Sequence, residues 1–250
     1  YAKRMLFKKF KGSLEQMPYM HYSSYQLNIK KKLKENFNII IFLPNFDDAQ
    51  NYYGGMVFSD FYEWITKTLE FLKTKNNISV AIKEHPNQTY ISSTLVELLK
   101  KKYKEFIWLN KFTNNKLIFK NKPKLGISVC GTVLHELAYH KLIALSSGNS
   151  PYKNYKFVFT PKSEGDYFKK INLAINEKLN LNRNFKEEIA EFYYMWYLNN
   201  NDDIENYSRI LDLKKYKSKV NENNILILSH FNKGILNNNL DKYIRNNKIL

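Results

Sequence analysis

The chain has 250 residues, enough to bury a large core within one domain. Lysine and arginine total 40 against 23 acidic residues, and the formal charge of +17 favours anionic partners: nucleotide phosphates, an acidic glycan or an anionic lipid surface. The single cysteine, Cys130, excludes an intramolecular disulfide, and no apolar run approaches the roughly 18 residues that cross a bilayer. We therefore expect a cytoplasmic protein that can associate peripherally with the inner face of the membrane.

Three regions of the chain differ in character. Residues 1–37 are basic and aromatic and predict a helical extension or an interdomain segment. Residues 38–184 alternate apolar runs with amphipathic stretches, the pattern of a Rossmann-like domain. Residues 185–250 begin with a predicted helix rich in large aromatic side chains and continue as an Asn-rich tail. The sequence begins with Tyr1 rather than Met, so we expect a fragment of a longer protein.

The Rossmann-like region opens with a continuous apolar run. Residues 39–43 have the composition of a buried parallel strand. The loop that follows, residues 47–55, carries Asp48 at the carboxyl end of this strand, the side on which ligands bind in parallel sheets. An amphipathic helix is predicted over residues 58–75, with Ser59 as its N-cap.

A second buried strand, residues 78–83, leads into Glu84, His85, Pro86 and Asn87. Proline fixes its own φ and pushes the preceding residue toward an extended conformation, so the imidazole of His85 is held at the tip of the strand. There it can donate a hydrogen bond to a phosphate. A purely structural His-Pro turn is the alternative, because such turns are common.

The following elements continue the alternation of strands and helices. The sequence predicts an amphipathic helix over residues 89–106, a short strand over 106–111 and a buried strand over 125–129. Further along, residues 156–163 predict another short strand and residues 164–179 a helix. This alternation is typical of an α/β fold with a doubly wound, Rossmann-like parallel sheet and helices on both faces. The order of the strands within the sheet does not follow from their order in the chain.

Small and polar residues are concentrated in residues 126–152, where a helix is predicted over residues 133–140. Gly131 lets the backbone approach a ligand closely because it has no Cβ atom. Thr132 is the predicted N-cap, and Glu136 lies one helical turn later, within reach of a sugar hydroxyl. Because a helix N-terminus offers free N–H groups to an anion, the sequence predicts a nucleotide phosphate site here.

Two motifs carry a resemblance to a known family: IKEHPN at residues 82–87 and SVCGTVLHELAYHKLIALSSGNSPY at residues 128–152. With these motifs in this order, the chain resembles the nucleotide-binding half of GT-B glycosyltransferases. It is most similar to the capsule polysaccharide biosynthesis group that includes the Kdo transferases, and more distantly similar to bacterial sialyltransferases with a His-Pro motif. The resemblance covers about residues 38–198.

The resemblance implies how the donor is bound. In such families the histidine of the His-Pro motif and small residues of the later loop contact the phosphate and the nucleotide, and a glutamate of the following helix binds the ribose. Transfer in GT-B enzymes characteristically needs no metal, and this sequence contains no Asp-x-Asp pair and no Cys/His cluster with metal-ligand spacing. No cofactor is expected beyond the nucleotide-sugar substrate, for which a CMP-linked sugar is the candidate. The candidate donor-binding residues are Glu84, Pro86, Asn87, Gly131, Thr132, Glu136, Ser146 and Tyr152.

Two residues are candidates for catalysis. His85 is expected to stabilise the leaving phosphate as its charge grows. Asp48 is the candidate base for the acceptor hydroxyl, because its loop lies at the same edge of the predicted sheet. A solvated loop carboxylate without a catalytic role is the alternative for Asp48.

The resemblance therefore implies a metal-independent glycosyltransferase that moves a sugar, Kdo or another acidic sugar, from a nucleotide donor to a bacterial capsule or lipopolysaccharide glycan or a lipid-linked acceptor. GT-B enzymes have two Rossmann-like domains, and only one is recognisable here. The acceptor half either lies outside this chain or is formed by residues 1–37 and 199–250. The alternatives are a polyol-phosphate transferase of related fold, a non-catalytic capsule-assembly subunit and a basic nucleic-acid-binding protein. Scattered lysines and the absence of RRM, OB or helix-turn-helix signatures argue against the last, so we expect no nucleic-acid partner.

Overall fold

The computed structural model describes residues 1–17, 20–25, 33, 35–48, 55–181 and 184–198. Tyr1–Glu15 and Met20–Met195 form one compact unit of the chain. Most of the lysine-rich part of the predicted N-terminal extension and the Asn-rich tail after residue 198 lie outside the described residues. Among the described helices, none has both the length and the apolar composition needed to cross a membrane.

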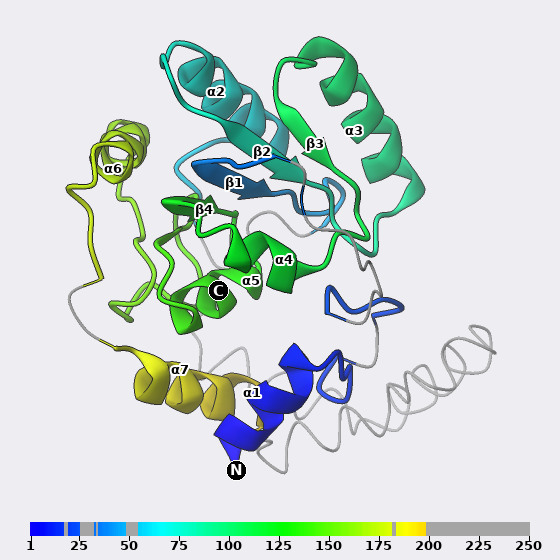
Figure 1. The fold of residues 1–250 in the computed structure, drawn as a ribbon, viewed down its shortest axis with the longest axis vertical. Coiled ribbons are helices and arrows are strands. Elements are labelled where there is room, and N and C mark those ends of the chain that lie inside the picture. Colours follow the sequence, from blue (N-terminus) through cyan, green and yellow to red (C-terminus); the bar gives the residue numbers. More distant parts are fainter. Residues whose placement is uncertain (18–19, 26–32, 34, 49–54, 182–183, 199–250) are drawn as a thin grey trace, which may run out of the picture. The chain divides into compact units, whose positions relative to one another are not determined.

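The centre of this unit is a five-stranded sheet in which all neighbouring strands are parallel (Figure 1). Its strands are β1 (Ile39–Phe42), β2 (Val80–Lys83), β3 (Ile107–Leu109), β4 (Leu125–Ile127) and β5 (Ala144–Leu145), and they lie in the order β3-β2-β1-β4-β5. Ile40 of the central strand β1 is in register with Ala81 of β2 on one side and Gly126 of β4 on the other. The predicted α/β class with a parallel sheet is confirmed, and the structure adds the strand order.

Helices cover both faces of this sheet, which is why β1 is apolar at every position (Figure 1). The helices are α1 (Ala2–Phe10), α2 (Phe61–Lys73), α3 (Tyr90–Lys102), α4 (Asn115–Lys120), α5 (Val133–Tyr139), α6 (Glu164–Ile175) and α7 (Lys186–Tyr193). Ile39 and Ile41 share a buried cluster with side chains of α2, α3 and α6. Ile40 points to the other face, where α5 packs so closely that a Cβ on Gly126 would lie 2.4 Å from Cδ1 of Leu137.

The strand order creates a switch point beside β1. The chain builds outward from β1 through β2 to β3 and then returns to place β4 on the opposite side of β1. The connections that leave the carboxyl ends of β1 and β4 therefore run to opposite faces of the sheet. In open α/β sheets, ligands bind in the crevice that opens at such a point.

The N-terminal helix α1 and the aromatic helix α7 belong to the same compact unit as the sheet. They pack against each other, α7 also packs against α5, and an exposed ion pair joins Lys3 to Glu187. Phe192 and Tyr193 of α7 are buried. The aromatic side chains at these two positions thus serve core packing, as expected for most aromatic stripes.

Some local predictions need correction. Helix α2 is capped by Asp60, not Ser59: Asp60 Oδ1 accepts from the Glu63 N–H at 2.6 Å. Ser59 N–H donates to Glu63 Oε2 at 2.6 Å, so the Glu63 side chain reaches back to the residue before the N-cap and not to the N-cap itself, as it would in a capping box. The strand predicted at residues 156–163 is reduced to a single bridge with β5, and the six-residue helix α4, too short for a periodic pattern, was not predicted.

Candidate functional site

The two motifs that the sequence singles out lie at one edge of the sheet. His85 follows β2 by two residues, and Gly131 follows β4 by four. Both strands pair with β1 and run parallel to it, so the turns that leave them flank the carboxyl end of β1. We call this place the carboxyl edge; it is the place that a ligand of a parallel sheet occupies.

Side-chain hydrogen bonds tie the loop after β1 to the turn after β2. Asp47 Oδ1 accepts from Thr89 Oγ1 at 2.7 Å and from Ser92 Oγ at 2.8 Å, and these bonds lower the pKa of Asp47. Asn45 Nδ2 donates to the carbonyl of Asn87 at 3.1 Å. The loop that presents Asp48 is thereby fixed beside the His-Pro turn.

The environment of His85 determines its protonation state and its tautomer. Burial, together with the positive charge of Lys83, lowers the pKa of His85 to about 4, so the ring is neutral at physiological pH. The backbone N–H of Asn87 donates to Nδ1 of His85 at 3.2 Å. Nδ1 therefore carries no proton, and the neutral ring has its proton on Nε2, which makes Nε2–H a hydrogen-bond donor.

Asp48 acts electrostatically on groups from two other strand ends. Its exposed carboxylate lies close enough to His85 and to Cys130 to favour a higher pKa for each of them. For Cys130, burial is the larger cause, and together the two raise the pKa of the thiol to about 11. Cys130 is therefore a protonated thiol and not a nucleophile. Asp48, in the loop after β1, thus interacts electrostatically with a residue that follows β2 and with one that follows β4.

Residues 21–25, which we call the crossing segment, pass over the carboxyl edge. The side chain of Asn87 binds it at one end: Oδ1 accepts from the N–H groups of His21 and Tyr22, both at 2.8 Å, and Nδ2 donates to the Tyr22 carbonyl at 3.0 Å. Near α4, the Asn115 N–H donates to the carbonyl of Ser24 at 3.0 Å. The sequence analysis missed this segment, because its partners are far away in the chain and no local pattern marks them.

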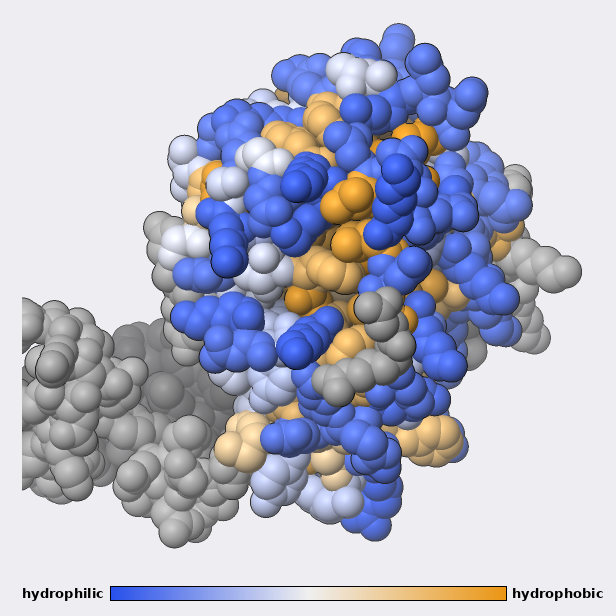
Figure 2. All heavy atoms as spheres, turned by 90° about the vertical axis from the view of Figure 1, so that its left-hand side faces the viewer, coloured by the Kyte–Doolittle hydropathy of each residue, from blue (hydrophilic) through white to orange (hydrophobic). Residues whose placement is uncertain are grey.

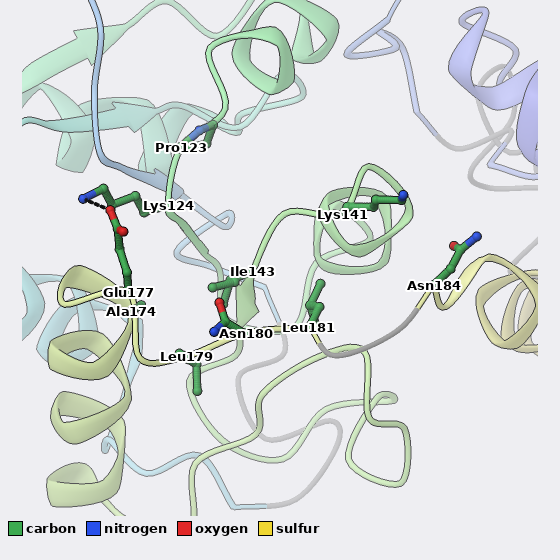
Figure 3. Close-up of a pocket in the computed structure, with 10 residues that line it drawn as sticks. All are labelled: Pro123, Lys124, Lys141, Ile143, Ala174, Glu177, Leu179, Asn180, Leu181 and Asn184. Atoms are coloured by element: carbon green, nitrogen blue, oxygen red, sulfur yellow. Dashed lines mark ion pairs between the residues drawn. The ribbon is translucent and has the colours of Figure 1, made fainter.

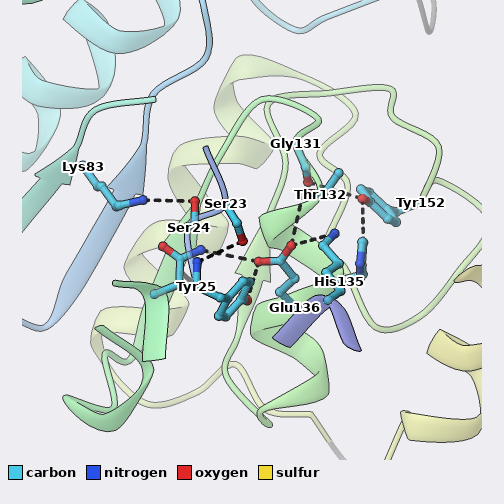
Figure 4. Close-up of polar contacts among 11 residues, drawn as sticks. Ser23, Ser24, Tyr25, Lys83, Gly131, Thr132, His135, Glu136 and Tyr152 are labelled. Atoms are coloured by element: carbon cyan, nitrogen blue, oxygen red, sulfur yellow. Dashed lines mark hydrogen bonds and ion pairs between the residues drawn. The ribbon is translucent and has the colours of Figure 1, made fainter. Parts of the chain in front are cut away.

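Glu136, the predicted ribose ligand, is buried at 3% exposure and has partners on both oxygens (Figure 4). Lys9 Nζ lies 2.8 Å from Oε1, and the hydroxyl of Tyr25 donates to Oε2 at 2.6 Å. Burial by itself would raise the pKa of Glu136, but the Lys9 charge and the hydrogen bonds outweigh it and lower that pKa to about 2. In this structure the carboxylate therefore joins α5 to α1 and to the crossing segment.

Thr132 occupies the predicted N-cap position of α5 but does not cap the helix with its side chain. Its hydroxyl donates to Glu136 Oε1 at 3.2 Å, within the same cluster. The position of the cap was predicted correctly, whereas the expected bond to the backbone is absent: Thr132 has helical backbone angles (φ −58°, ψ −24°) instead of the extended conformation from which an N-cap side chain reaches the helix N–H groups.

The remaining predicted donor-binding residues make contacts within the protein near the carboxyl edge. The Tyr152 hydroxyl is buried; it donates to the Gly131 carbonyl at 3.3 Å and lies 3.1 Å from Nδ1 of the buried His135 (Figure 4). Ser146 is fully buried and donates to a neighbouring backbone carbonyl. Glu84 forms a 2.6 Å ion pair with Lys100 of α3, and Pro86 is partly buried. Tyr152 thus holds the Gly131 turn in place.

A cavity of about 550 Å³ lies at the opposite edge of the sheet, where β4 and β5 begin (Figure 3). An ion pair between Lys124 and Glu177, 2.7 Å long, stands at its side. The face of the molecule that carries α6 is mainly hydrophilic, with a strip of hydrophobic residues between the hydrophilic ones (Figure 2). The cavity contains neither the His-Pro turn nor the Gly131–Thr132 turn; it is lined by Pro123, Lys124, Lys141, Ile143, Ala174, Glu177, Leu179, Asn180, Leu181 and Asn184.

Within the ranges that the structure describes, no group of three or more His, Cys, Asp or Glu side chains is placed to hold a metal ion. No protein-family model matches the chain, and no curated protein matches its sequence. The functional assignment therefore depends on the residues at the carboxyl edge.

Proposed function

We propose that this chain is the nucleotide-binding half of a GT-B-type glycosyltransferase that works without a metal ion. Its donor would be a nucleotide sugar, CMP-linked Kdo or another acidic sugar, and its acceptor a bacterial surface glycan of the capsule or lipopolysaccharide type, free or lipid-linked. One observation carries the proposal. The His-Pro turn after β2 and the Gly131–Thr132 turn after β4 flank β1 at the switch point of a parallel sheet.

The chemistry of the proposed site suits a phosphate leaving group. Negative charge grows on the phosphate as the bond to the sugar breaks, and a fixed hydrogen-bond donor stabilises it. His85 fits this role because its Nδ1 is occupied by the Asn87 N–H and its Nε2–H is left to donate. The high positive charge of the chain, +17, favours the approach of an anionic donor.

Asp48 is the proposed base for the acceptor hydroxyl. It is exposed, it belongs to the loop after the central strand, and its charge reaches His85. A base must come within hydrogen-bond reach of the acceptor hydroxyl that it deprotonates, so it must be open to the acceptor and lie at the reaction site; Asp48 is exposed and lies near His85.

The proposed contact between Glu136 and the ribose requires a rearrangement. Oε2 of Glu136 accepts from the Tyr25 hydroxyl, so a ribose hydroxyl can bind this oxygen only after Tyr25 moves away. Binding of the nucleotide would then be coupled to movement of the crossing segment.

Peripheral attachment to the inner membrane is part of the proposal and is supported by α1. Phe7 of this helix and Tyr1 at its N-cap are exposed beside several basic side chains, a combination typical of interfacial helices. Such attachment would bring the site to a lipid-linked acceptor.

Calorimetric titration with CMP, UDP, CMP-linked and UDP-linked sugars and CDP-glycerol tests the donor class. We expect a CMP-linked or UDP-linked sugar to bind, and His85→Ala to weaken this binding by about 1–3 kcal/mol, the range for one hydrogen bond to a charged group. His140→Ala is the matched control, because His140 is exposed at the other end of α5.

Each contrary outcome has a defined meaning. Binding of CDP-glycerol without binding of nucleotide sugars would replace the proposal by a polyol-phosphate transferase. Absence of any nucleotide binding, or equal affinities of wild type and a folded His85→Ala, would refute it. Nucleotide binding without sugar transfer in the full-length protein would favour a non-catalytic assembly subunit.

A further inference from the structure

Lys83, the last residue of β2, is a buried lysine that has no acidic partner among the described residues. Only 2% of its surface is exposed. Its Nζ has one hydrogen bond, to the hydroxyl of Ser24 in the crossing segment, and this bond is long at 3.4 Å (Figure 4). In the part of the chain that the structure describes, no carboxylate forms an ion pair with it.

A charged ammonium group in this position lowers the stability of the folded protein. A buried charge is normally paired, because its loss of hydration is otherwise not compensated. Lys9 shows the ordinary arrangement, with its Nζ 2.8 Å from Glu136. For Lys83, burial is the main influence and lowers the pKa to about 8; the negative charges of Glu136 on α5 and Glu84 beside it act in the opposite direction but are too weak to cancel it.

Lys83 is also close to the proposed donor site. It precedes His85 by two residues, and its charge contributes to the low pKa of that histidine. Its ammonium group reaches the underside of the crossing segment, whose Tyr25 covers Glu136. An anion that accepts a hydrogen bond from the neutral His85 would therefore find in Lys83 a positive group that has no carboxylate partner among the described residues.

We propose that Lys83 binds a phosphate of the donor, and that the Ser24 hydroxyl occupies the place of a phosphate oxygen in the unliganded protein. This inference rests on the proposed function, since it assigns a further residue to the same site. A phosphate offers several strong acceptor oxygens, so it can accept from the Lys83 ammonium and from Nε2–H of His85 together. Pairing with the phosphate compensates the buried charge, so binding raises the pKa of Lys83 from about 8 and stabilises its charged form further.

Two substitutions at Lys83 test the role of its charge. We expect Lys83→Met to weaken the binding of CMP and of inorganic pyrophosphate by about 10- to 100-fold, the effect of a lost hydrogen bond between charged groups. Lys83→Arg keeps the charge and should retain most of the affinity. Lys124→Met is the control for net charge, because Lys124 lies at the opposite edge of the sheet in an exposed ion pair.

The proton uptake that accompanies ligand binding distinguishes direct binding of the phosphate by Lys83 from a purely structural role of this residue. Titrations of the wild type at about pH 8, in two buffers with different ionisation heats, should show uptake of about half a proton per ligand, because Lys83 is then half protonated and binding charges it fully. Lys83→Arg should bind without this uptake, since its guanidinium is always charged. Lys83→Met should lack the uptake as well.

The outcomes distinguish this inference from the proposed function. If nucleotide binds and depends on His85, but Lys83→Met and Lys83→Arg keep wild-type affinity and proton uptake, the role of Lys83 is refuted and the proposed function stands. If pyrophosphate binds in a Lys83-dependent way but no nucleotide does, the phosphate site stands and the nucleotide-sugar donor is refuted. Absence of both kinds of binding refutes both.

Discussion

Replacement of either buried lysine by methionine removes the same charge, but we expect opposite effects on stability. Lys9→Met leaves the carboxylate of Glu136 buried without its cation. Removal of one partner from a buried pair typically lowers the free energy of unfolding by about 3–5 kcal/mol. Lys83→Met removes a charge for which the described part of the chain offers no acidic partner, and a methionine of similar length fills the same space.

The increase in the free energy of unfolding that we expect for Lys83→Met follows from the lowered pKa of the lysine. A shift from 10.5 to about 8 corresponds to an upper limit of about 3 kcal/mol, so we expect a gain of about 1–3 kcal/mol at neutral pH. The destabilisation by the buried charge is at its full size below about pH 8, where Lys83 is charged in the folded and in the unfolded protein. It disappears as the pH rises toward 10.5. The advantage of the variant over the wild type should therefore shrink over the same range.

Urea unfolding at neutral pH and at about pH 10 measures both effects. Lys3→Met is the control, because Lys3 is exposed in its ion pair with Glu187 and such pairs contribute about 1 kcal/mol or less. A Lys9→Met variant as stable as the wild type would refute the account of Glu136. A Lys83→Met variant less stable than the wild type would refute the account of an uncompensated charge.

Three further predictions concern packing, the crossing segment and the thiol. Gly126→Ala should lower the free energy of unfolding by about 1–3 kcal/mol because of its clash with Leu137, whereas Gly55→Ala, with open space around it, should be neutral in the same thermal melts. Asn87→Ala should speed hydrogen exchange of the two amides that its side chain binds by about 10-fold, the effect of one lost hydrogen bond, and unchanged exchange would show that Asn87 does not hold the crossing segment. Cys130 should react with iodoacetamide far more slowly than free cysteine at about pH 8, since its pKa is raised to about 11; a comparable rate would show that the thiol is not buried as described.

The sequence alone was sufficient for elements whose signal is local. The apolar run of β1 predicted a strand buried on both faces, and the amphipathic pattern of α2 predicted its buried side. His85 and Gly131 could be placed at strand ends because Pro86 and the glycine mark those ends within a few residues. The alternation of strands and helices then predicted the parallel sheet.

The tertiary structure decided everything that depends on contacts between distant parts of the chain. The strand order, which places β1 between the two motifs, follows from packing of all the strands and helices together. The partners of Glu136, one on α1 and one in the crossing segment, have no signature near it in the sequence. In the sequence, nothing distinguishes Lys83 from the other lysines. Its burial beside Ser24, which the tertiary structure determines, is what makes its charge unusual. Propensity and periodicity act over a few residues, whereas burial and charge compensation are properties of the assembled fold.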